Sequence, residues 1–252
     1  MTRVACIFFP KGIAPCDLKA LAEAAWRFSS QVALRPGEAL FVETGRSALL
    51  YSEPTLAARF KIMAKRCGRD FFLAFGADAA EALARSRSGA AETSPRESLP
   101  LSSLLDWASP FQHDHESESR LLPMIAAFKS LGLSRLGDFL KLPREALGAR
   151  FGSDAAFLSA RIQEGFGMAW PRFQPDPVLR ESFRMDPDGD LSGQDLLQPL
   201  LFALKGLLDR MASRLTGRGL RATRLRLHLR LEGPRRGLQG PERVLDIAFP
   251  LP

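Results

Sequence analysis

The chain has 252 residues, of which 46% are hydrophobic and 25% are charged, and this ordinary globular composition excludes a wholly disordered protein. The net charge of +7 favours acidic partners such as nucleic acid, because a basic surface attracts polyanions. No apolar run reaches the roughly 18 residues of a membrane span, and the apolar N-terminus is too short for a signal peptide. We therefore expect a cytoplasmic protein without a membrane partner, whose three cysteines stay reduced.

The first 87 residues have the pattern of a small α+β domain. Apolar residues at helical spacing predict helices at 16–28, 54–66 and 77–87. Short or alternating apolar runs predict strands before Pro10, at 32–34, at 40–42, at 49–51 and at 71–75. Apart from the run at 49–51, these elements follow the order β-α-β-β-α-β-α, which suits an α+β or ferredoxin-like sheet with its helices on one face.

The middle of the chain is predicted to be helical. Residues 88–98 are small and polar and read as a linker, and residues 99–167 follow with a helical pattern. The charged stretch 112–119 is expected to interrupt the helices as a solvated loop. The proline-rich stretch 171–190 predicts an extended connection.

The last 60 residues predict one long helix and two strands. The helix covers 193–216, is ended by Gly217 and Gly219, and precedes strands at 222–232 and 243–249. Its apolar residues are expected to form a buried stripe. They are Leu196, Leu197, Leu200, Leu201, Leu204, Leu207, Leu208, Met211 and Leu215.

A glycine-bounded segment within 131–152 is the first candidate for DNA contact. Gly132 and Gly137 enclose Arg135 between two apolar helical patterns, as in a helix-hairpin-helix. Such a turn leaves backbone N–H groups to face phosphate, which holds DNA without reading its bases. The alternative is a helical hairpin that only packs.

The strand at 222–232 is the second candidate. Side chains alternate along a strand, so Arg224, Arg226 and Arg230 share the face opposite the leucines. Three guanidinium groups in a row repel one another unless solvent or a polyanion screens them. The nearby Arg218 and Arg221 extend the basic stretch and favour DNA over a merely solvated face.

Three other motifs are weaker. The stretch His113–Glu116 has metal-ligand residue types, but neighbouring side chains in a loop seldom converge on one ion. The stretch Asp186–Asp190 resembles the start of a calcium loop and fails where Leu191 and Leu197 replace Gly and Glu. No metal or cofactor is predicted. The stretch Gln198–Phe202 resembles the peptide by which bacterial proteins bind the sliding clamp, although core packing in the helix is the favoured interpretation.

The ordered set of segments resembles the ImuB-like, catalytically inactive branch of the Y-family DNA polymerases. Residues 21–34 and 38–50 resemble the approach to the palm hairpin and the hairpin itself. Residues 99–101 and 131–167 resemble the thumb, and residues 200–220 the start of the little finger. The resemblance implies an α+β multi-domain protein with a reduced palm at 1–87, a linker at 88–98, a helical thumb at 99–170, a second linker at 171–190 and a little-finger-like domain at 191–252.

The sequence departs from the active polymerases at their metal site. Active members need carboxylates to hold two Mg²⁺ ions. Residues 1–16 contain no acidic residue, and Gly37 and Glu38 stand where the hairpin's Asp-Glu pair belongs. The resemblance therefore implies a protein without polymerase activity and without a full fingers domain.

The resemblance implies a DNA-binding scaffold in translesion synthesis and damage-induced mutagenesis. Its expected partners are DNA, an ImuA-like protein of the RecA fold, an error-prone C-family polymerase and the sliding clamp. Two alternatives remain open: an active error-prone Y-family polymerase, and a protein-interaction module that does not bind DNA.

Overall fold

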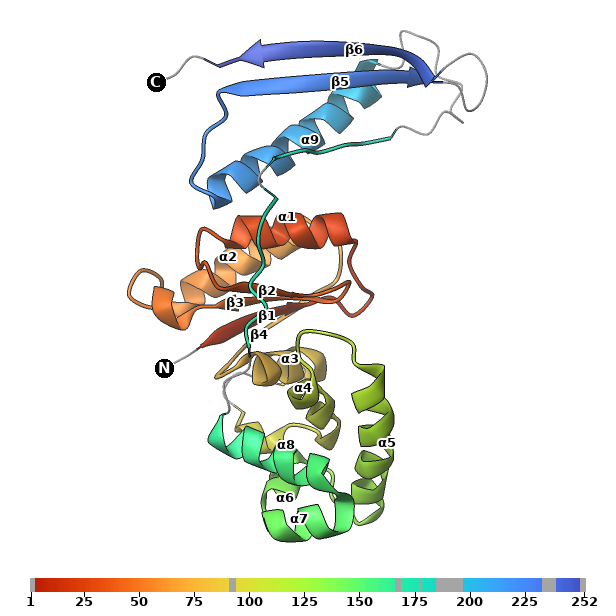
Figure 1. Cartoon of the computed structure of the whole chain (residues 1–252). Coiled ribbons are helices and arrows are strands. Elements are labelled where there is room, and N and C mark those ends of the chain that lie inside the picture. Colours follow the sequence, from red (N-terminus) through yellow and green to blue (C-terminus); the bar gives the residue numbers. More distant parts are fainter. Residues whose placement is uncertain are drawn as a thin grey trace. The chain divides into compact units, whose positions relative to one another are not determined.

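The computed structural model describes residues 3–90, 94–165, 169–176, 178–184, 197–232 and 239–249. It divides into two compact units, Met1–Arg180 (unit 1) and Glu181–Pro252 (unit 2) (Figure 1). The chain is of the mixed α+β class, as predicted. Within the described part of the chain, none of the helices combines the length and the apolar character needed to cross a bilayer.

Unit 1 begins with a small antiparallel sheet in the strand order β2-β3-β1-β4. The strands are β1 (Val4–Phe8), β2 (Val32–Arg35), β3 (Ala39–Glu43) and β4 (Phe72–Gly76). The helices between and after them are α1 (Pro15–Ala25), α2 (Glu53–Lys65) and α3 (Ala79–Ser88). This order of elements and strands is that of a ferredoxin-like unit followed by one further helix.

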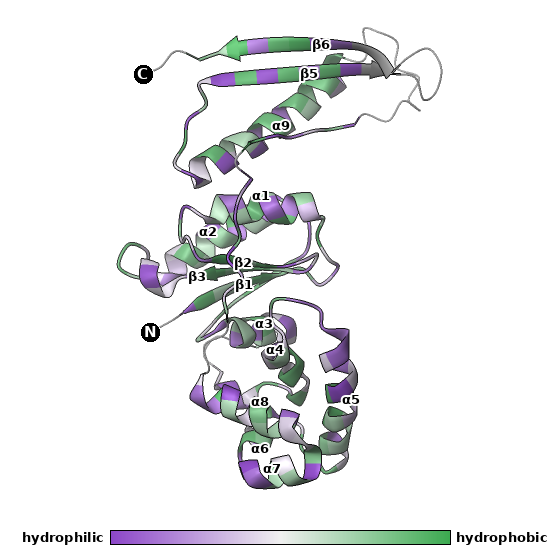
Figure 2. Cartoon of the chain, viewed as in Figure 1, coloured by the Kyte–Doolittle hydropathy of each residue, from purple (hydrophilic) through white to green (hydrophobic). Residues whose placement is uncertain are grey.

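The sheet is covered on both faces, which corrects the prediction that all the helices share one face. Helices α1 and α2 pack against Ala5, Ile7 and Phe9 on one side, while α3 packs against Cys6 and Phe8 on the other. Figure 1 shows α3 across the sheet from α1 and α2, and Figure 2 shows how uniformly apolar the strands are. A strand without polar residues needs cover on both faces, so β1 requires a helix on each side.

The predicted strand at 49–51 is wrong. After β3 the chain turns through the 3₁₀ helix η1 (Gly45–Ser47), and α2 begins at Glu53. The side chains of Leu49 and Leu50 are 99% and 78% exposed. Because β3 already lies between β2 and β1, it offers no free edge with which a further strand could pair.

From Arg96 to Glu164 unit 1 is helical, as predicted, around a core that contains Trp107, Phe128 and Phe139. The elements of this stretch are η2 (Arg96–Ser98), η3 (Leu101–Ser103), α4 (Leu104–Ala108), α5 (His115–Ser130), α6 (Leu136–Leu140), α7 (Arg144–Phe151) and α8 (Ser153–Glu164). The predicted loop at 112–119 is wrong from His115 onward. The Asp114 carboxylate accepts a hydrogen bond from the Ser117 N–H at 3.2 Å and so caps α5.

Unit 2 contains α9 (Leu197–Gly217) and a hairpin of β5 (Arg224–Glu232) with β6 (Gln239–Ala248). The predicted buried leucine stripe is wrong. Among the described residues of α9 only Arg214 and Gly217 are buried, while Leu201 and Leu208 are 53% and 39% exposed. A two-stranded hairpin is too narrow to cover the apolar side of a 21-residue helix. The calcium-loop stretch Asp186–Asp190 lies outside the described residues.

Candidate nucleic-acid interface

Strand β5 places Arg224, Arg226 and Arg230 on one exposed face of the hairpin. Its leucines Leu225, Leu227 and Leu229 alternate with them and are half-buried. The alternation is visible along β5 in Figure 2. The sequence therefore predicted correctly that the three arginines share a face.

Strand β6 supplies carboxylates to the same face, which the sequence interpretation missed. Asp246 lies directly opposite Arg226, and its two oxygens accept hydrogen bonds from the guanidinium at 2.9 and 3.3 Å. Glu242 lies opposite Arg230 and accepts hydrogen bonds from it at 3.4 Å and from His228 at 2.8 Å. Three guanidinium groups thus face two carboxylates, so the face is less positive than the row of arginines alone suggested.

These contacts lower the pKa values of Asp246 and Glu242. The hydrogen bond from Arg226 holds the pKa of Asp246 below its ordinary value. The hydrogen bond from His228, helped by Arg230, does the same for Glu242. Both acids are exposed, and solvent-exposed ion pairs are weak. A phosphate can therefore compete with Asp246 and Glu242 for the arginines.

The other two predicted arginines lie between α9 and β5. Arg218 follows the last turn of α9 and is half-buried, with its N–H donating to the Arg214 and Leu215 carbonyls. Arg221 is exposed. The structure thus brings both to the chain segment that leads into β5, and their contact with DNA stays a prediction.

The turn between α5 and α6 does not have the free N–H groups that the helix-hairpin-helix interpretation requires. The N–H groups of Ser134 and Arg135 donate to the Asp138 carboxylate at 3.3 and 3.1 Å, and that of Leu136 donates to the Leu99 carbonyl at 2.8 Å. The Gly132 N–H likewise donates to a carbonyl within the turn. A phosphate contact here would instead rest on the exposed side chain of Arg135.

The two glycines of this segment differ in role. Gly132 is exposed and has φ +85°, a left-handed conformation that glycine adopts without strain. Gly137 is buried, and a Cβ atom there would lie 2.8 Å from the Glu97 Cβ and 3.0 Å from the Glu97 carbonyl oxygen. Close packing is therefore a sufficient reason for glycine at position 137.

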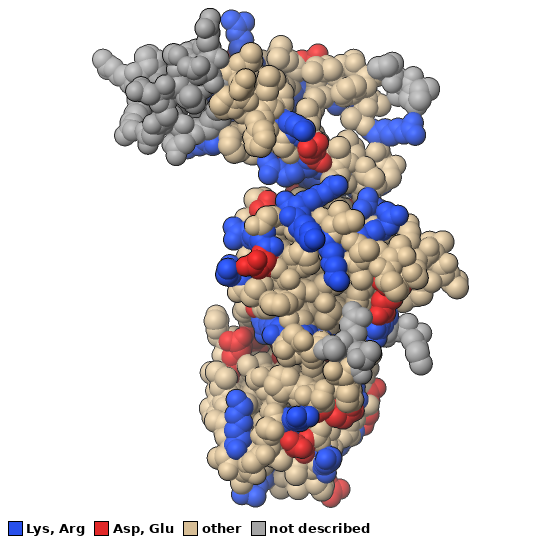
Figure 3. Space-filling model, turned by 180° about the vertical axis from the view of Figure 1, so that it is seen from behind, with Lys and Arg blue, Asp and Glu red and all other residues tan. Residues whose placement is uncertain are grey.

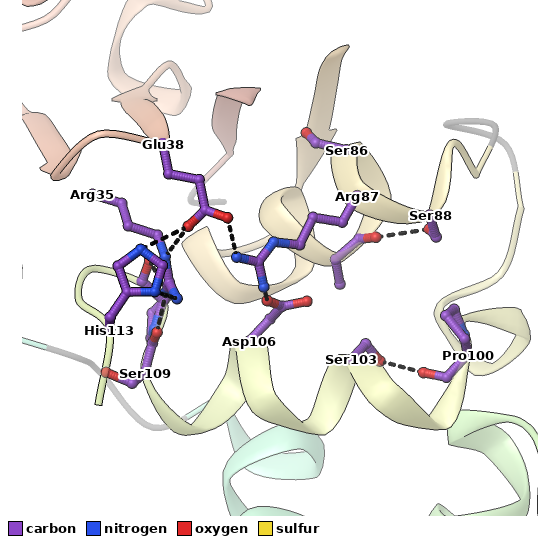
Figure 4. A network of polar contacts seen from close by, with 12 residues as sticks. Arg35, Glu38, Ser86, Arg87, Ser88, Pro100, Ser103, Asp106, Ser109 and His113 are labelled. Atoms are coloured by element: carbon purple, nitrogen blue, oxygen red, sulfur yellow. Dashed lines mark hydrogen bonds and ion pairs between the residues drawn. The ribbon is translucent and has the colours of Figure 1, made fainter. Parts of the chain in front are cut away.

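A cluster of ion pairs surrounds Glu38, which the sequence resemblance was expected to align with the metal site of active polymerases (Figure 4). Glu38 directly precedes β3. One of its carboxylate oxygens contacts Arg35 and His113, at 2.5 and 3.2 Å, and the other contacts Arg87 of α3 at 2.5 Å. Arg87 also pairs with Asp106 of α4 at 2.6 Å. We call these five side chains the Glu38 cluster.

The Glu38 cluster joins the sheet to the helices. Arg35 is buried and also donates to the Ser109 and Pro110 carbonyls, which follow α4. Burial alone would raise the pKa of Glu38, but hydrogen bonds and charges from Arg87 and Arg35 outweigh it, so the pKa lies below its ordinary value. Burial raises the pKa of Asp106 to about 6 despite its neighbouring arginines. The sequence interpretation missed Arg35, Arg87 and Asp106, because the contacts that close the cluster join residues 19 to 78 positions apart, which no local pattern indicates.

The residues around Glu38 do not fit a pair of Mg²⁺ ions. Both oxygens of Glu38 are engaged by cationic or histidine side chains, and β1 contributes only apolar residues. Arg87 lies between Glu38 and Asp106, where its positive charge opposes a metal ion. Within the described residues, no group of three or more His, Cys, Asp or Glu side chains is arranged to hold a metal.

The histidines of the sequence motif His113–Glu116 do not converge. His113 contacts Glu38 in the cluster, whereas His115 is exposed at the start of α5, 3.8 Å from Glu118. The clamp-like stretch Gln198–Phe202 is helical from Leu197 onward, as predicted. Its side chains are not in a core, however: Leu201 is 53% and Phe202 is 81% exposed.

Comparison with known proteins adds no relative to this picture: no protein-family model matches the chain, and no curated protein matches it.

Proposed function

We propose that the protein is a non-catalytic, DNA-binding scaffold of the Y-family polymerase type that acts in translesion synthesis and damage-induced mutagenesis. The observation that carries the proposal is the set of contacts made by Glu38. An active polymerase keeps several carboxylates open to two Mg²⁺ ions, whereas here a single carboxylate is enclosed by Arg35, Arg87 and His113. The same position thus carries an ion-pair cluster that connects structural elements.

The order of elements supports the resemblance. A ferredoxin-like sheet, a helical layer with a short turn between α5 and α6, and a basic hairpin after a long helix follow one another along the chain. This is the order of a palm, a thumb and a little finger. Assignment of these names to the parts of the chain belongs to the proposal.

DNA is the partner that the charge pattern favours. Arg224, Arg226 and Arg230 present a basic strand to solvent, and backbone contacts of this kind carry no base information. The resemblance further implies an ImuA-like protein, an error-prone C-family polymerase and the sliding clamp as protein partners.

Primer extension tests the loss of catalysis. We expect no templated nucleotide addition with Mg²⁺ or Mn²⁺, by the wild type or by Glu38→Gln. Extension by the wild type that disappears in Glu38→Gln would establish the rival function, an active polymerase.

A salt series of DNA binding tests the basic hairpin. Replacing Arg224, Arg226 and Arg230 with Ser should reduce the slope of log Kd against log salt by about one unit for each lost phosphate contact. Arg243→Ser is the control, because Arg243 pairs with Leu229 and so lies on the opposite face of the hairpin. Equal slopes for the wild type and the triple variant would refute the DNA-binding face.

The second candidate function is a protein-interaction module without DNA binding. The exposed apolar side chains of α9, Leu197, Leu201 and Phe202, favour it. In that case the arginine variant would leave DNA affinity unchanged, whereas replacing Phe202 would weaken binding of a protein partner.

A further inference from the structure

The exposed residues of α2 include three cations, together with the apolar Ile62, which is 57% exposed. The buried residues of α2 are Leu56, Phe60, Met63 and Ala64. With 3.6 residues per turn, Arg59 and Lys61 lie on the two flanks of the exposed side, and Lys65 lies between them near Lys61. The basic residues of α2 itself are Arg59, Lys61 and Lys65, and Arg66 and Arg69 follow in the turn before β4. We call these five residues the α2 basic surface.

The α2 basic surface has no carboxylate of its own. Within the part of the chain that the structure describes, none of its five side chains forms an ion pair. The acidic residues at the two ends of this stretch are used elsewhere: Glu53 pairs with Arg3 at 2.6 Å, and Asp70 pairs with Lys11 at 2.9 Å. This differs from β5, where Arg226 and Arg230 have carboxylate partners.

A further guanidinium lies close to this surface. Arg27, just after α1, has its pKa lowered by partial burial and then by the charges of Arg59 and Arg66. Three like charges therefore lie near enough to repel one another. The helix dipole favours a cation only near the last turn, which accounts for Lys65 but not for Arg59 or Lys61. Figure 3 shows Lys and Arg side chains gathered at the level of α1 and α2.

An exposed aromatic ring lies beside two of the five basic residues, Lys65 and Arg69. A shallow hollow at the end of α2 is lined by Lys65, Arg69, Phe71 and Phe72, together with Pro10 and Asp70. Phe72 is the first residue of β4, at the edge of the sheet, and is 49% exposed. Cations that follow a phosphate backbone and a ring on which a base can stack are the two parts of a single-strand binding surface.

We propose that the α2 basic surface and Phe72 bind single-stranded nucleic acid, with Arg59, Lys61 and Arg66 on phosphates and a base stacked on Phe72. A duplex keeps its bases stacked on one another, so it would use the charges but not the ring. This surface lies in unit 1, and its binding does not depend on the β5–β6 hairpin of unit 2.

The first experiment removes the charge. The variant Arg59→Gln, Lys61→Gln, Arg66→Gln keeps good helix formers at exposed positions. The matched control is Lys11→Gln, Arg120→Gln, Arg144→Gln, which removes three cations that already have carboxylate partners. Binding of a labelled oligo-dT strand is followed by fluorescence anisotropy over a range of salt concentrations.

The α2 variant should bind more weakly, with a slope of log Kd against log salt that is smaller by about two units, because each phosphate contact on a single strand contributes about 0.7. The control should change the slope by less than about one unit. Equal changes in the two variants would overturn the proposal, since they would mean that only total charge matters.

The second experiment separates stacking from charge. Phe72→Leu keeps an apolar side chain at the sheet edge but removes the ring. We expect about tenfold weaker binding of oligo-dT with an unchanged salt slope, and no change for a hairpin duplex. An effect of equal size on the duplex, or none on the single strand, would overturn the assignment to single strands.

A footprint on the wild-type chain covers the case in which a variant fails to fold. Bound oligo-dT should protect Lys61 and Lys65 from acetylation, and loss of protection at high salt should follow loss of binding. Full acetylation of both lysines in the complex would overturn the proposal. Because the arginine variant of the hairpin is measured with the same strand, failure of the hairpin assignment and failure of this one give different results.

Discussion

Asp106 is the residue whose charge state most directly couples the Glu38 cluster to pH. Burial raises its pKa from 3.8 to about 6, so the folded protein holds a proton that the unfolded chain releases in this range. A raised carboxyl pKa means that its stabilising contribution is present at low pH and is lost as the pH rises through about 6. The nearby Glu38, whose pKa is lowered, has the opposite dependence and matters only at more acidic pH.

We therefore expect Asp106→Asn to remove part of the pH dependence of stability. Between about pH 7 and pH 5, the free energy of unfolding of the wild type should rise relative to the variant by about 1 kcal/mol. Asn still offers an oxygen to Arg87, so the contact itself is kept. Urea unfolding at several pH values measures the difference, and parallel curves for the two proteins would contradict the raised pKa.

A substitution at Gly137 distinguishes two roles for this glycine, close packing against Glu97 and contact with DNA phosphate. The Cβ atom of Gly137→Ala would lie 3.0 Å from the Glu97 carbonyl oxygen, so the backbone must shift, at a cost of about 1–3 kcal/mol. Gly206→Ala in α9 is the control. Apart from its chain neighbours and the backbone of α9 itself, no described atom lies within 4 Å of its added Cβ, and the change should stabilise the helix by up to about 1 kcal/mol.

Thermal unfolding measures both glycine variants, and DNA binding is measured well below the melting temperature. A Gly137→Ala protein that is less stable but binds DNA as tightly as the wild type would assign this glycine to packing alone. Unchanged stability with weaker binding would restore the phosphate-contact interpretation.

At the scale of single residues, the sequence sufficed to predict which side chains share a face of a strand, but not which residues they pair with. Strand periodicity sufficed to place Arg224, Arg226 and Arg230 together, because side-chain alternation is a local property. The pairing of Arg226 with Asp246 depends on the register of the hairpin, and the alternation within one strand does not specify that register. Asp246 and Glu242 are nevertheless spaced for one strand face, so that part of the neutralisation was detectable.

At the scale of elements, helix α9 shows where a periodic pattern misleads. Its leucine spacing predicted a helix correctly, but periodicity says which side of a helix is apolar and not how much of that side is covered. The two other wrong elements have local causes. The apolar alternation at 49–51 follows β3, which has a strand on each side and so no edge to pair with, and an N-cap at Asp114 makes the predicted charged loop the start of α5.

The partial cover of α9 leads to graded effects of leucine replacement. Leu204 is half-buried and Leu208 is 39% exposed. Leu204→Ala should destabilise unit 2 by about 1–2 kcal/mol, below the 2–5 kcal/mol typical of full burial, and Leu208→Ala by at most about 0.5 kcal/mol.

Two signals separate the units in this experiment. The three Trp residues, Trp26, Trp107 and Trp170, all lie in unit 1. The unfolding transition followed by Trp fluorescence should therefore be unchanged, while the loss of helical circular dichroism should begin at a lower temperature. Equal, large effects of both leucine variants would mean that α9 is covered by something that the described residues do not include. If neither leucine variant changes stability, the apolar side of α9 is not part of a core and is available to a partner.

At the scale of the whole molecule, the two units differ in what stabilises them. Every residue of the three buried hydrophobic clusters belongs to unit 1, whereas α9 and the hairpin bury little. Both units carry net positive charge, +4 for residues 1–180 and +3 for residues 181–252. A polyanion can therefore be held by either unit, although among the described residues only those of unit 1 form buried hydrophobic clusters.

The last prediction follows from this division. A chain that ends at Arg180 keeps all three clusters, so we expect it to fold and to show the Trp fluorescence unfolding transition of the full chain. Linking two binding surfaces makes the second contact intramolecular, so the full chain should bind DNA more tightly than the fragment and with a steeper salt slope. The difference in slope should equal the loss caused by replacing Arg224, Arg226 and Arg230 in the full chain.

If the fragment and the full chain have the same slope and affinity, the hairpin makes no phosphate contact. DNA binding by the full chain alone, with none by the folded fragment, would instead locate all of it in unit 2 and would contradict the α2 basic surface.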